Sequence, residues 1–309
     1  NAAPAPAPLL TPDELAAVRR PYRAASLLPG RAYHASAFWS WEREHLFAHD
    51  WLVVGRVEDL ADGELAASIA GAAVRVAGSP SAPALVEPPD GRIATWQGIV
   101  FVSLAPTGPA LADQLGDLAD RLDPLDLVRL RVARRMDYEV AANWKLIAEN
   151  YSECYHCPGL HPQLNHLTPY DEGGDFEPVT GAWQGGWMNL VRGAETMSVD
   201  GRRSGRPLLP GLPEEDACRI GYYVVWPLTF LSVHPDYLLV HRLLPDAPTR
   251  TRIACEMLVD PEVAARPGFT LDDAVAFWDL TNRQDWHVCE LQQRGTMSRS
   301  WRAGRYATN

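Results

Sequence analysis

Residues 144–157 carry apolar side chains at helical spacing, and no glycine or proline interrupts them. The positions that recur on one side are Leu146, Ile147, Asn150, Tyr151 and Cys154. Because such spacing is typical of a helix, we expect one that runs to Cys157. Pro158 and Gly159 are expected to end it, since proline cannot continue a helix and glycine is favoured just after one.

A second helical pattern occupies residues 271–294, with Gly295 as its expected end. Its apolar positions predict a largely buried helix: Phe277, Trp278, Thr281, Trp286, Val288, Cys289 and Leu291. Asp285 lies in the middle of this segment. A carboxylate is rarely buried unless it is paired or binds a metal, so Asp285 is a candidate for special chemistry.

Apolar runs of strand length fill much of the remaining chain. They cover residues 51–57, 74–76, 99–104, 130–140, 180–190, 220–226, 229–234, 237–244 and 251–259. The last four follow one another at short spacing, which predicts an antiparallel sheet. Together with the long helices, they indicate an α+β fold in which the sheet wraps around the helices.

Shorter helices and loops are predicted between these segments. Thr11, followed by Pro12 and Glu14, has the pattern of a capping box and starts a helix. Further helices are expected at 38–50 and, on the surface, at 110–122, whereas the Pro- and Gly-rich residues 78–92 read as loop. Residues 195–215 lack periodicity and are a candidate lid or entry loop.

Composition narrows the classes of function. The net charge of −11 argues against nucleic acid as a partner, because phosphate binding needs a concentrated basic surface. The uncharged apolar run at residues 220–235 is too short for a membrane span and is interrupted by Pro227. The cysteines show no disulfide framework and no segment is typical of a signal peptide, so we expect a cytoplasmic protein. Residues 1–10 form an Ala/Pro tail that is expected to be disordered.

The first helical segment also contains most of the candidate chemistry. Glu149, Glu153 and His156 are spaced to share one helical face, and His161 follows in the next turn. Two imidazoles that arrive from different backbone directions can bind one metal side by side. With Asp285 as third ligand they form the two-histidine, one-carboxylate set of non-haem Fe(II) oxygenases.

These residues also have explanations that do not involve a mononuclear iron site. Asp285 could simply pair with Arg283 or Lys145. Cys154 and Cys157 could join the histidines in a zinc site, although structural zinc sites usually show two separated ligand pairs.

Two motifs make the sequence recognisable. The first motif is Asn143–Trp–Lys with Glu149–Asn–Tyr–Ser–Glu–Cys–Tyr–His–Cys and His161–Pro, and the second is the distant Asp285–Trp–His–Val–Cys–Glu. In these motifs the chain resembles the catalytic domain of Rieske non-haem iron oxygenase α subunits. The branch that it resembles contains the carnitine, choline and glycine-betaine oxygenases. The resemblance implies a helix-grip (START-like) catalytic domain with antiparallel sheet around long helices.

The resemblance also implies roles for single residues. His156, His161 and Asp285 would bind mononuclear Fe(II), and Glu153 would be the bridging acid that connects this iron with a cluster in a neighbouring subunit. Asn150, Glu149 and Glu290 are expected around the ligands. Trp183, Trp187, Tyr222 and Trp226 are candidate substrate-pocket residues, because aromatic faces can hold a quaternary ammonium group by cation–π attraction.

One region departs from the family pattern. A Rieske domain binds its [2Fe–2S] cluster through two cysteines and two histidines, but neither residue type occurs between Trp51 and Leu104. We therefore expect N-terminal helices at 11–50, a reduced remnant of a Rieske domain at 51–104 and the iron domain at 105–309. Either the protein lacks a cluster of its own, or the cluster-binding segment lies outside this sequence.

The favoured function is an O2-dependent non-haem Fe(II) oxygenase that hydroxylates or oxidatively demethylates a small organic substrate. Its electrons would come from a Rieske-bearing subunit or a reductase, in a homo- or heterotrimer or a hexamer. Two alternatives stay open. One is an aromatic ring-hydroxylating α subunit, and the other is a non-catalytic scaffold or regulatory subunit of a Rieske oxygenase complex.

Overall fold

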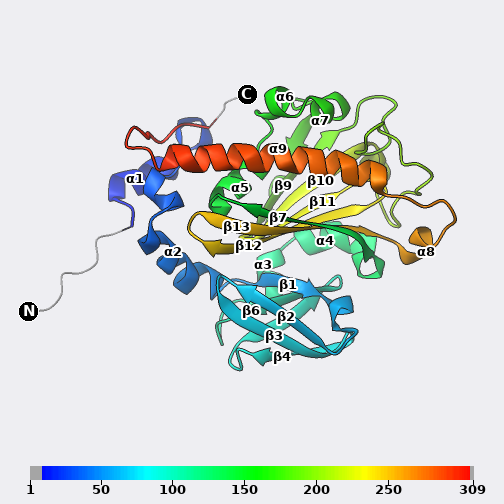
Figure 1. Ribbon diagram of the computed structural model, residues 1–309, viewed down its shortest axis with the longest axis horizontal. Helices are drawn as coiled ribbons and strands as arrows, with labels where there is room; N and C mark the ends of the chain where they lie inside the picture. The colour runs from blue at the N-terminus through cyan, green and yellow to red at the C-terminus, as the bar shows by residue number, and fades with distance from the viewer. Residues whose placement is uncertain (1–8, 307–309) are drawn as a thin grey trace, which may run out of the picture.

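The computed structural model of the protein describes residues 9–306, so most of the predicted Ala/Pro tail lies outside the described residues. The fold is α+β, with a large antiparallel sheet, two small sheets and one long helix, α9, across the large sheet (Figure 1). The predicted fold class is therefore confirmed.

The large sheet has seven strands in the order β7-β13-β12-β11-β10-β9-β8, and each neighbouring pair is antiparallel. Its strands are β7 (Arg131–Val140), β8 (Gly173–Asp175), β9 (Trp183–Asn189), β10 (Arg219–Val225), β11 (Thr229–Val233), β12 (Leu238–Ala247) and β13 (Arg250–Val259). The four strands predicted between residues 220 and 259 correspond to β10 to β13.

Two three-stranded sheets occupy residues 52–103. Their orders are β1-β6-β5 and β2-β3-β4. The strands are β1 (Leu52–Arg56), β2 (Glu64–Ile69), β3 (Ala72–Ser79), β4 (Ala82–Glu87), β5 (Arg92–Trp96) and β6 (Ile99–Ser103). In Figure 1 these sheets lie on the opposite side of the large sheet from α9.

Helices cover both faces of the large sheet. The α-helices are α1 (Pro12–Val18), α2 (Ser36–Glu42), α3 (Leu111–Leu115), α4 (Leu118–Leu122), α5 (Trp144–Tyr151), α6 (Cys157–Leu160), α7 (Pro162–Leu167), α8 (Pro261–Ala264) and α9 (Asp272–Thr296). α5 packs against α9 on one face, and α3 and α4 lie toward the small sheets on the other (Figure 1). The predicted capping box of Thr11 and Glu14 is present at the start of α1.

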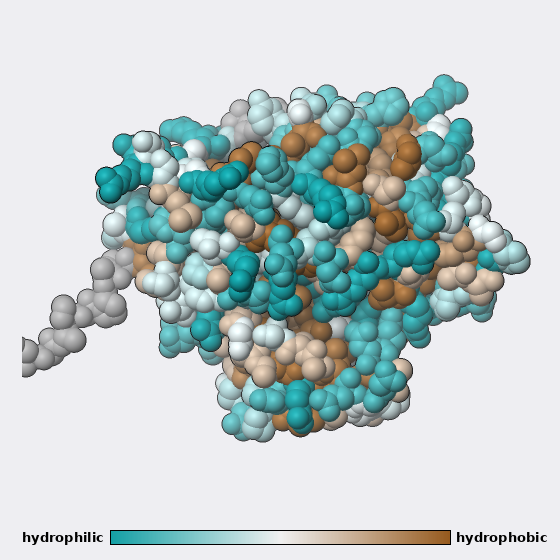
Figure 2. Space-filling view, viewed as in Figure 1, coloured by the Kyte–Doolittle hydropathy of each residue, from teal (hydrophilic) through white to brown (hydrophobic). Residues whose placement is uncertain are grey.

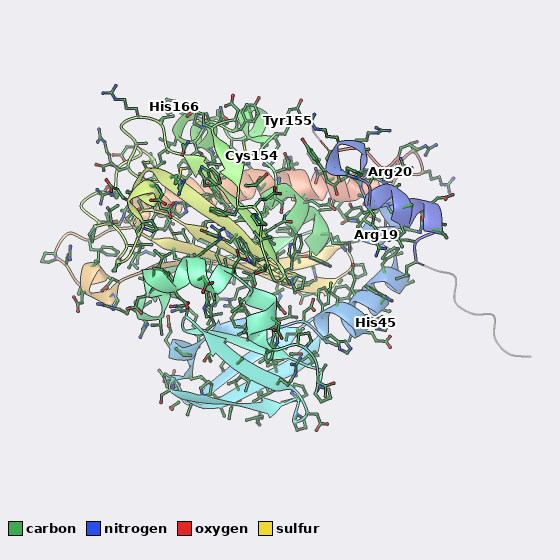
Figure 3. The ribbon with its side chains drawn as sticks, turned by 180° about the vertical axis from the view of Figure 1, so that it is seen from behind. Arg19, Arg20, His45, Cys154, Tyr155 and His166 are labelled. Carbon is green, nitrogen blue, oxygen red and sulfur yellow. The ribbon has the colours of Figure 1, made fainter. Side chains whose placement is uncertain are left out.

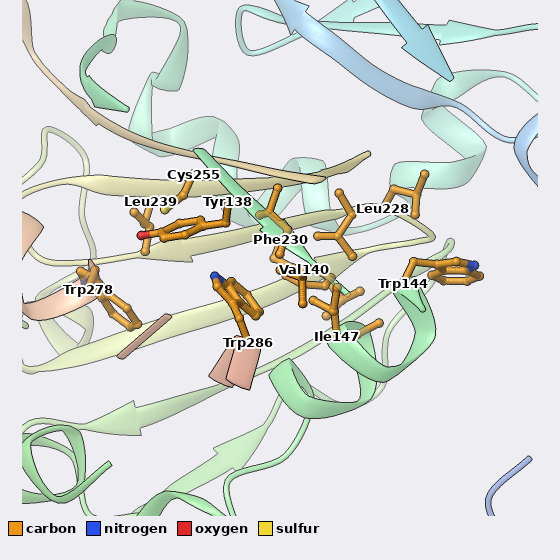
Figure 4. Close-up of a cluster of buried hydrophobic side chains, with 14 of the residues drawn as sticks. Tyr138, Val140, Trp144, Ile147, Leu228, Phe230, Leu239, Cys255, Trp278 and Trp286 are labelled. Carbon is orange, nitrogen blue, oxygen red and sulfur yellow. The ribbon is translucent and has the colours of Figure 1, made fainter. Parts of the chain in front are cut away.

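The large sheet divides the hydrophobic core into two halves, one on each face. Phe230 and Leu239 point from β11 and β12 toward α9, where Trp278 and Trp286 pack against them (Figure 4). Leu231 and Val240, the next residues on the same strands, point to the other face and pack with α3 and α4. Successive strand residues alternate between faces, so each strand serves both halves of the core.

The predicted helix 144–157 is shorter than expected. α5 ends at Tyr151, and the hydroxyl of Ser152 donates to the carbonyl oxygen of Ala148 at 2.7 Å. The chain then turns, and Pro158 stands in the first turn of α6 instead of ending the preceding helix. Proline is tolerated there because the first helical N–H groups have no intrahelical partner.

Other predicted boundaries are also wrong. The expected loop 78–92 contains β4. The expected helix 110–122 is broken into α3 and α4 at Gly116, whose φ of 51° and close approach to the Thr180 carbonyl exclude a larger residue. α9 runs through Gly295, because an internal glycine weakens a helix without ending it.

No helix in residues 9–306 is long and apolar enough to cross a membrane. Figure 2 shows the face crossed by α9 as a mixture of polar and hydrophobic residues. Leu280 and Leu291 are among the exposed large hydrophobic residues of that helix.

The segment 195–215 is irregular, as predicted, but it is anchored. The Arg206 guanidinium donates to Asp236 at 2.7 Å and to Asp273, at the start of α9, at 2.8 Å. The side chains of Arg206 and Asp236 are buried. A lid made from this whole segment would have to break a buried ion pair when it opens. Only the parts of the segment away from Arg206 could move at a low cost in free energy.

We expect Arg206→Ala to lower the free energy of unfolding by about 3–5 kcal/mol, because it leaves the Asp236 carboxylate buried without its partner. Urea unfolding followed by tryptophan fluorescence measures the change. The matched control is Arg202→Ala, whose side chain is 61% exposed beside Glu195 and should matter by less than about 0.5 kcal/mol. Equal effects of the two substitutions would contradict the anchoring role.

Candidate metal centre

Three predicted ligands converge in space. One ligand atom each from His156, His161 and Asp285 can be chosen so that all three lie within 4.8 Å of one another. His156 lies in the turn before α6, His161 joins α6 to α7, and Asp285 lies halfway along α9. Residues about 125 positions apart in the sequence therefore meet because α9 packs beside α5 to α7.

The contacts within this group place two imidazole nitrogens against one carboxylate. The Nε2 atom of His161 lies 2.8 Å from Asp285 Oδ1, and the Nε2 atom of His156 lies 3.3 Å from the same oxygen. Although burial opposes ionisation, hydrogen bonds from both histidines hold the pKa of Asp285 below its usual value. Asp285 is thus a carboxylate at neutral pH, as a metal ligand must be.

Gln284 fixes the orientation of His161. The Nδ1 atom of His161 lies 2.7 Å from Gln284 Oε1, so Nδ1 carries the proton and Nε2 is the nitrogen that faces Asp285. Gln163 donates to the same Oε1 at 2.8 Å. Only 1% of the His161 side chain is exposed. Partners of this kind set the direction of metal-binding histidines in proteins.

Glu153 holds His156 in a similar way, but from the surface. Its Oε1 lies 2.6 Å from His156 Nδ1, and its Oε2 accepts from the N–H of Tyr155 at 2.7 Å. The Glu153 side chain is 49% exposed. Glu153 and His156 lie in the turn after α5, not in the helix. The prediction that Glu149, Glu153 and His156 share one helical face is therefore wrong.

Protonation of His156 is coupled to this carboxylate environment. Burial disfavours the imidazolium, but hydrogen bonds to Asp285 and Glu153 outweigh it and raise the pKa of His156 to about 10. A cation that binds Nε2 must therefore displace a proton, and its affinity should rise with pH.

Of the three residues expected around the ligands, only Asn150 lies there. Its Nδ2 is 3.4 Å from His156 Nε2. The Glu149 carboxylate accepts from the Tyr33 hydroxyl at 2.7 Å instead, and burial raises its pKa to about 7. Glu290 accepts from the Ala141 N–H at 3.0 Å. The placement of Glu149 and Glu290 beside the ligands is therefore wrong.

The explanations that do not involve a mononuclear iron site do not fit the contacts. Arg283 pairs with Asp279 at 2.8 Å, and Lys145 pairs with Glu42, so neither is the partner of Asp285. The Cys157 sulfur lies 4.0 Å from His156 Nε2 and the Cys154 sulfur 3.4 Å from the Met188 sulfur. Neither thiol belongs to the converging group found among the described residues.

Two of the predicted substrate-pocket residues point away from the metal centre. Trp183 donates to Asp117 at 3.1 Å and packs in the core on the far face of the sheet. Trp187, four residues later on β9, packs against Phe176, and Arg219 lies 5.3 Å from the centre of its ring. The next residue, Met188, points to the opposite face, where its sulfur contacts Cys154. Trp183 and Trp187 are therefore wrong as pocket residues, because the strand alternation places them on the other face.

The other two predicted pocket residues contact the core on the side of α9. The Tyr222 ring lies 6.0 Å from the ring of Tyr151, which belongs to α5. Trp226 is partly buried against the same core at the end of β10. Figure 3 shows Cys154 and Tyr155 near α6 at the edge of the molecule, far from His45 in the N-terminal helices.

Comparison with known proteins agrees with this geometry. Residues 127–309 match the family described as ring hydroxylating alpha subunit (catalytic domain). The chain is 30% identical over 237 residues to the glycine betaine monooxygenase oxygenase subunit of Chromohalobacter salexigens, covering 68% of this chain and 53% of that protein. It is 25% identical over 216 residues to the carnitine monooxygenase oxygenase subunit of Escherichia coli, with coverage of 68% and 53%. The chain thus spans about half the length of these curated relatives.

Solved structures share the fold at lower identity. A quaternary ammonium Rieske monooxygenase in complex with an inhibitor aligns with a TM-score of 0.74 at 20% identity, covering 92% of this chain and 90% of that chain. Naphthalene 1,2-dioxygenase from Rhodococcus aligns with a TM-score of 0.69 at 16% identity, with coverage of 91% and 85%. The alignments include the small sheets as well as the large one, since they cover nine tenths of this chain.

We expect Gln284→Leu to weaken Fe(II) binding by about 10- to 100-fold, because His161 Nδ1 loses the acceptor that orients the ring. Competition with a chelator under anaerobic conditions gives the affinity. Gln292→Leu, the same change at an exposed position of α9, is the control and should bind like the unaltered protein. If both variants keep full affinity, Gln284 does not support a metal ligand.

Proposed function

This chain belongs to the ring-hydroxylating alpha-subunit family, and on that premise we propose that it is the oxygenase subunit of a non-haem iron monooxygenase that acts on a small organic substrate. One observation carries the proposal. His156, His161 and Asp285 converge from separate elements, and the buried His161 is aimed by Gln284. A non-catalytic scaffold subunit would not need such a convergence of ligand residues.

The donor set fits iron. Two neutral imidazoles and one carboxylate leave further coordination positions free and are typical of mononuclear Fe(II) oxygenases. His156 and His161 would bind through Nε2 and Asp285 through Oδ1, the atoms that already face one another. When bound, iron would supply the activation of O2 for attack on a substrate C–H bond.

The surrounding residues perform the tasks that remain to the protein. Gln284 and Glu153 hold the imidazole rings in place. Tyr151, Phe230 and Trp286 form an apolar wall beside the centre, which excludes water and positions the substrate. Proton release from His156 accompanies metal binding.

Residues 51–104 do not fit an iron–sulfur cluster. The segment folds into the small sheets but contains no cysteine and no histidine, the ligands that a Rieske cluster requires. We propose that it is a reduced remnant of a Rieske domain. Electrons would come from a Rieske cluster elsewhere, on a partner subunit or on a part of the protein outside this sequence, in a trimer or a hexamer.

Glu153 is our candidate for the acid at the point of electron entry. It touches His156 with one oxygen and is half exposed, so it connects the centre with the surface. If a neighbouring subunit covered this surface, its electron donor would be separated from the iron ligand His156 only by Glu153.

The names of the relatives suggest a substrate class. They are described as glycine betaine and carnitine monooxygenases, so we propose a quaternary ammonium substrate for this chain. The rings of Tyr151, Tyr222 and Phe230 lie together beside the centre and would attract its positive methyl groups.

The test of the proposed function is the amount of iron and acid-labile sulfide per chain after anaerobic loading with Fe(II). We expect about one iron and no sulfide, as for a mononuclear site without a cluster. The double variant His156→Ala/His161→Ala is the control and should bind no iron. Negligible iron in the unaltered protein would contradict an oxygenase, and sulfide in the product would contradict the proposed remnant.

Glu153→Gln should keep iron binding, because the amide oxygen still accepts from His156 Nδ1. Turnover with a Rieske-bearing donor should fall by about 100-fold or more, since the charged acid is lost from the entry point. Iron content and product formation are measured on the same preparation. A parallel loss of iron would show that Glu153 only supports the ligand, and full turnover would remove it from the electron path.

A further inference from the structure

Polar atoms without a protein partner gather behind the metal centre. Among the described residues, the Tyr222 hydroxyl, the Nδ1 atom of His241 and the Nε1 atom of Trp286 are buried and make no hydrogen bond. Only 2% of His241 and 7% of Trp286 is exposed. A buried polar group without a partner is costly, so such groups in native proteins usually serve a ligand or an ordered water.

These residues form a continuous row that begins at the centre. Trp286 follows the predicted ligand Asp285 on α9, and Figure 4 shows its indole turned from α9 toward the sheet. The His241 ring, on β12, lies 6.2 Å from the Trp286 ring and 6.3 Å from the Tyr151 ring. Tyr151 in turn lies 6.0 Å from Tyr222. The row occupies the layer between α9 and the large sheet.

The hydrogen-bonding character of each atom can be assigned. The Asn282 amide nitrogen donates to the Tyr138 hydroxyl at 3.4 Å and to the Cys255 sulfur at 3.6 Å, so its oxygen faces His241. His241 Nε2, 3.3 Å from that oxygen, therefore carries the proton, and Nδ1 is an acceptor. The Trp286 Nε1–H group can only donate, whereas the Tyr222 hydroxyl can do both.

This set is uncharged. Burial lowers the pKa of His241 to about 4, so the imidazole is neutral at physiological pH. The groups that face the ring from the neighbouring elements are the Tyr151, Phe230 and Trp286 rings and the Asn282 amide, and the nearest charge is Asp285. A neutral donor beside a neutral acceptor matches a hydroxyl group, which accepts one hydrogen bond and donates another.

We propose that Trp286, His241 and Tyr222 recognise a hydroxyl group of the substrate, which accepts from Trp286 Nε1–H and from the Tyr222 hydroxyl and donates to His241 Nδ1. This rests on the proposed function and deepens it: the substrate is a quaternary ammonium compound that carries an alcohol. The same polar atoms reject an analogue without the hydroxyl, because that analogue would leave them buried and unpaired.

The test uses two probes that differ in this group alone. L-carnitine has a hydroxyl that γ-butyrobetaine lacks, and both were bound as substrates in solved structures of a quaternary ammonium Rieske monooxygenase. Isothermal titration of the anaerobic, iron-loaded protein should show L-carnitine binding at least about tenfold more tightly than γ-butyrobetaine.

Substitutions then assign the preference to the three side chains. Tyr222→Phe keeps the ring and removes the hydroxyl, Trp286→Phe replaces the indole by a smaller aromatic ring without the N–H group, and His241→Leu removes the acceptor. Each should weaken L-carnitine binding alone and bring the two affinities within about threefold, because the lost hydrogen bond concerns only the hydroxyl. Tyr223→Phe is the matched control, since Tyr223 lies one residue from Tyr222 but packs on the far face of the sheet. It should keep the full preference.

The outcomes separate this inference from the proposed function. A protein that takes up no iron contradicts the function itself. An iron-loaded protein that binds neither probe, or both equally, overturns the recognition of a hydroxyl, as does a preference that survives in Trp286→Phe and Tyr222→Phe. Both variants keep an aromatic side chain at the substituted position, and thermal unfolding verifies that each is folded even if His241→Leu does not fold.

Discussion

The carboxylate of Asp285, held between two imidazoles, is the constraint on which the rest of the structure depends. It brings α9 into register with the turn after α5, because a shift of one residue along α9 would replace Asp285 by Gln284 or Trp286. That register also sets Gln284 against His161 and turns Trp286 toward the sheet. Three consecutive residues of one helix, Gln284 to Trp286, thus occupy the positions of a support for a ligand, a ligand and a substrate contact in the proposed function.

The sequence was most informative where residue type and spacing carry chemistry. His156, His161 and Asp285 could be named without coordinates, since only a few metals and ligand sets suit such residues. The strands between residues 219 and 259 could also be predicted from the sequence, because their apolar runs are separated by short turns. The end of α5 could not be predicted, because Ser152 to His156 continue its helical pattern, whereas in the structure Ser152 leaves the helix with φ −88° and ψ 4°.

The face to which an aromatic residue points was the other property that sequence could not settle. Trp183 and Tyr222 belong to neighbouring strands, yet one contacts Asp117 on the far face and the other contacts Tyr151 beside the centre. A sheet buried on both sides has no polar alternation to mark its faces. Gln284 was missed for a related reason: nothing in an isolated glutamine signals that a histidine from a different element will lie against it.

The proposed remnant of a Rieske domain can fold without a cluster. The small sheets bury Leu60, Ile69, Val74, Val76 and Val100 in a core continuous with that of the large sheet, so hydrophobic packing accounts for their folding without a metal. The Arg242 guanidinium, on β12, also donates to the Val54 carbonyl of β1 at 3.1 Å and ties the two parts together. The segment supports the far face of the large sheet, while Glu153 is half exposed and would be open to an electron donor in the proposed function.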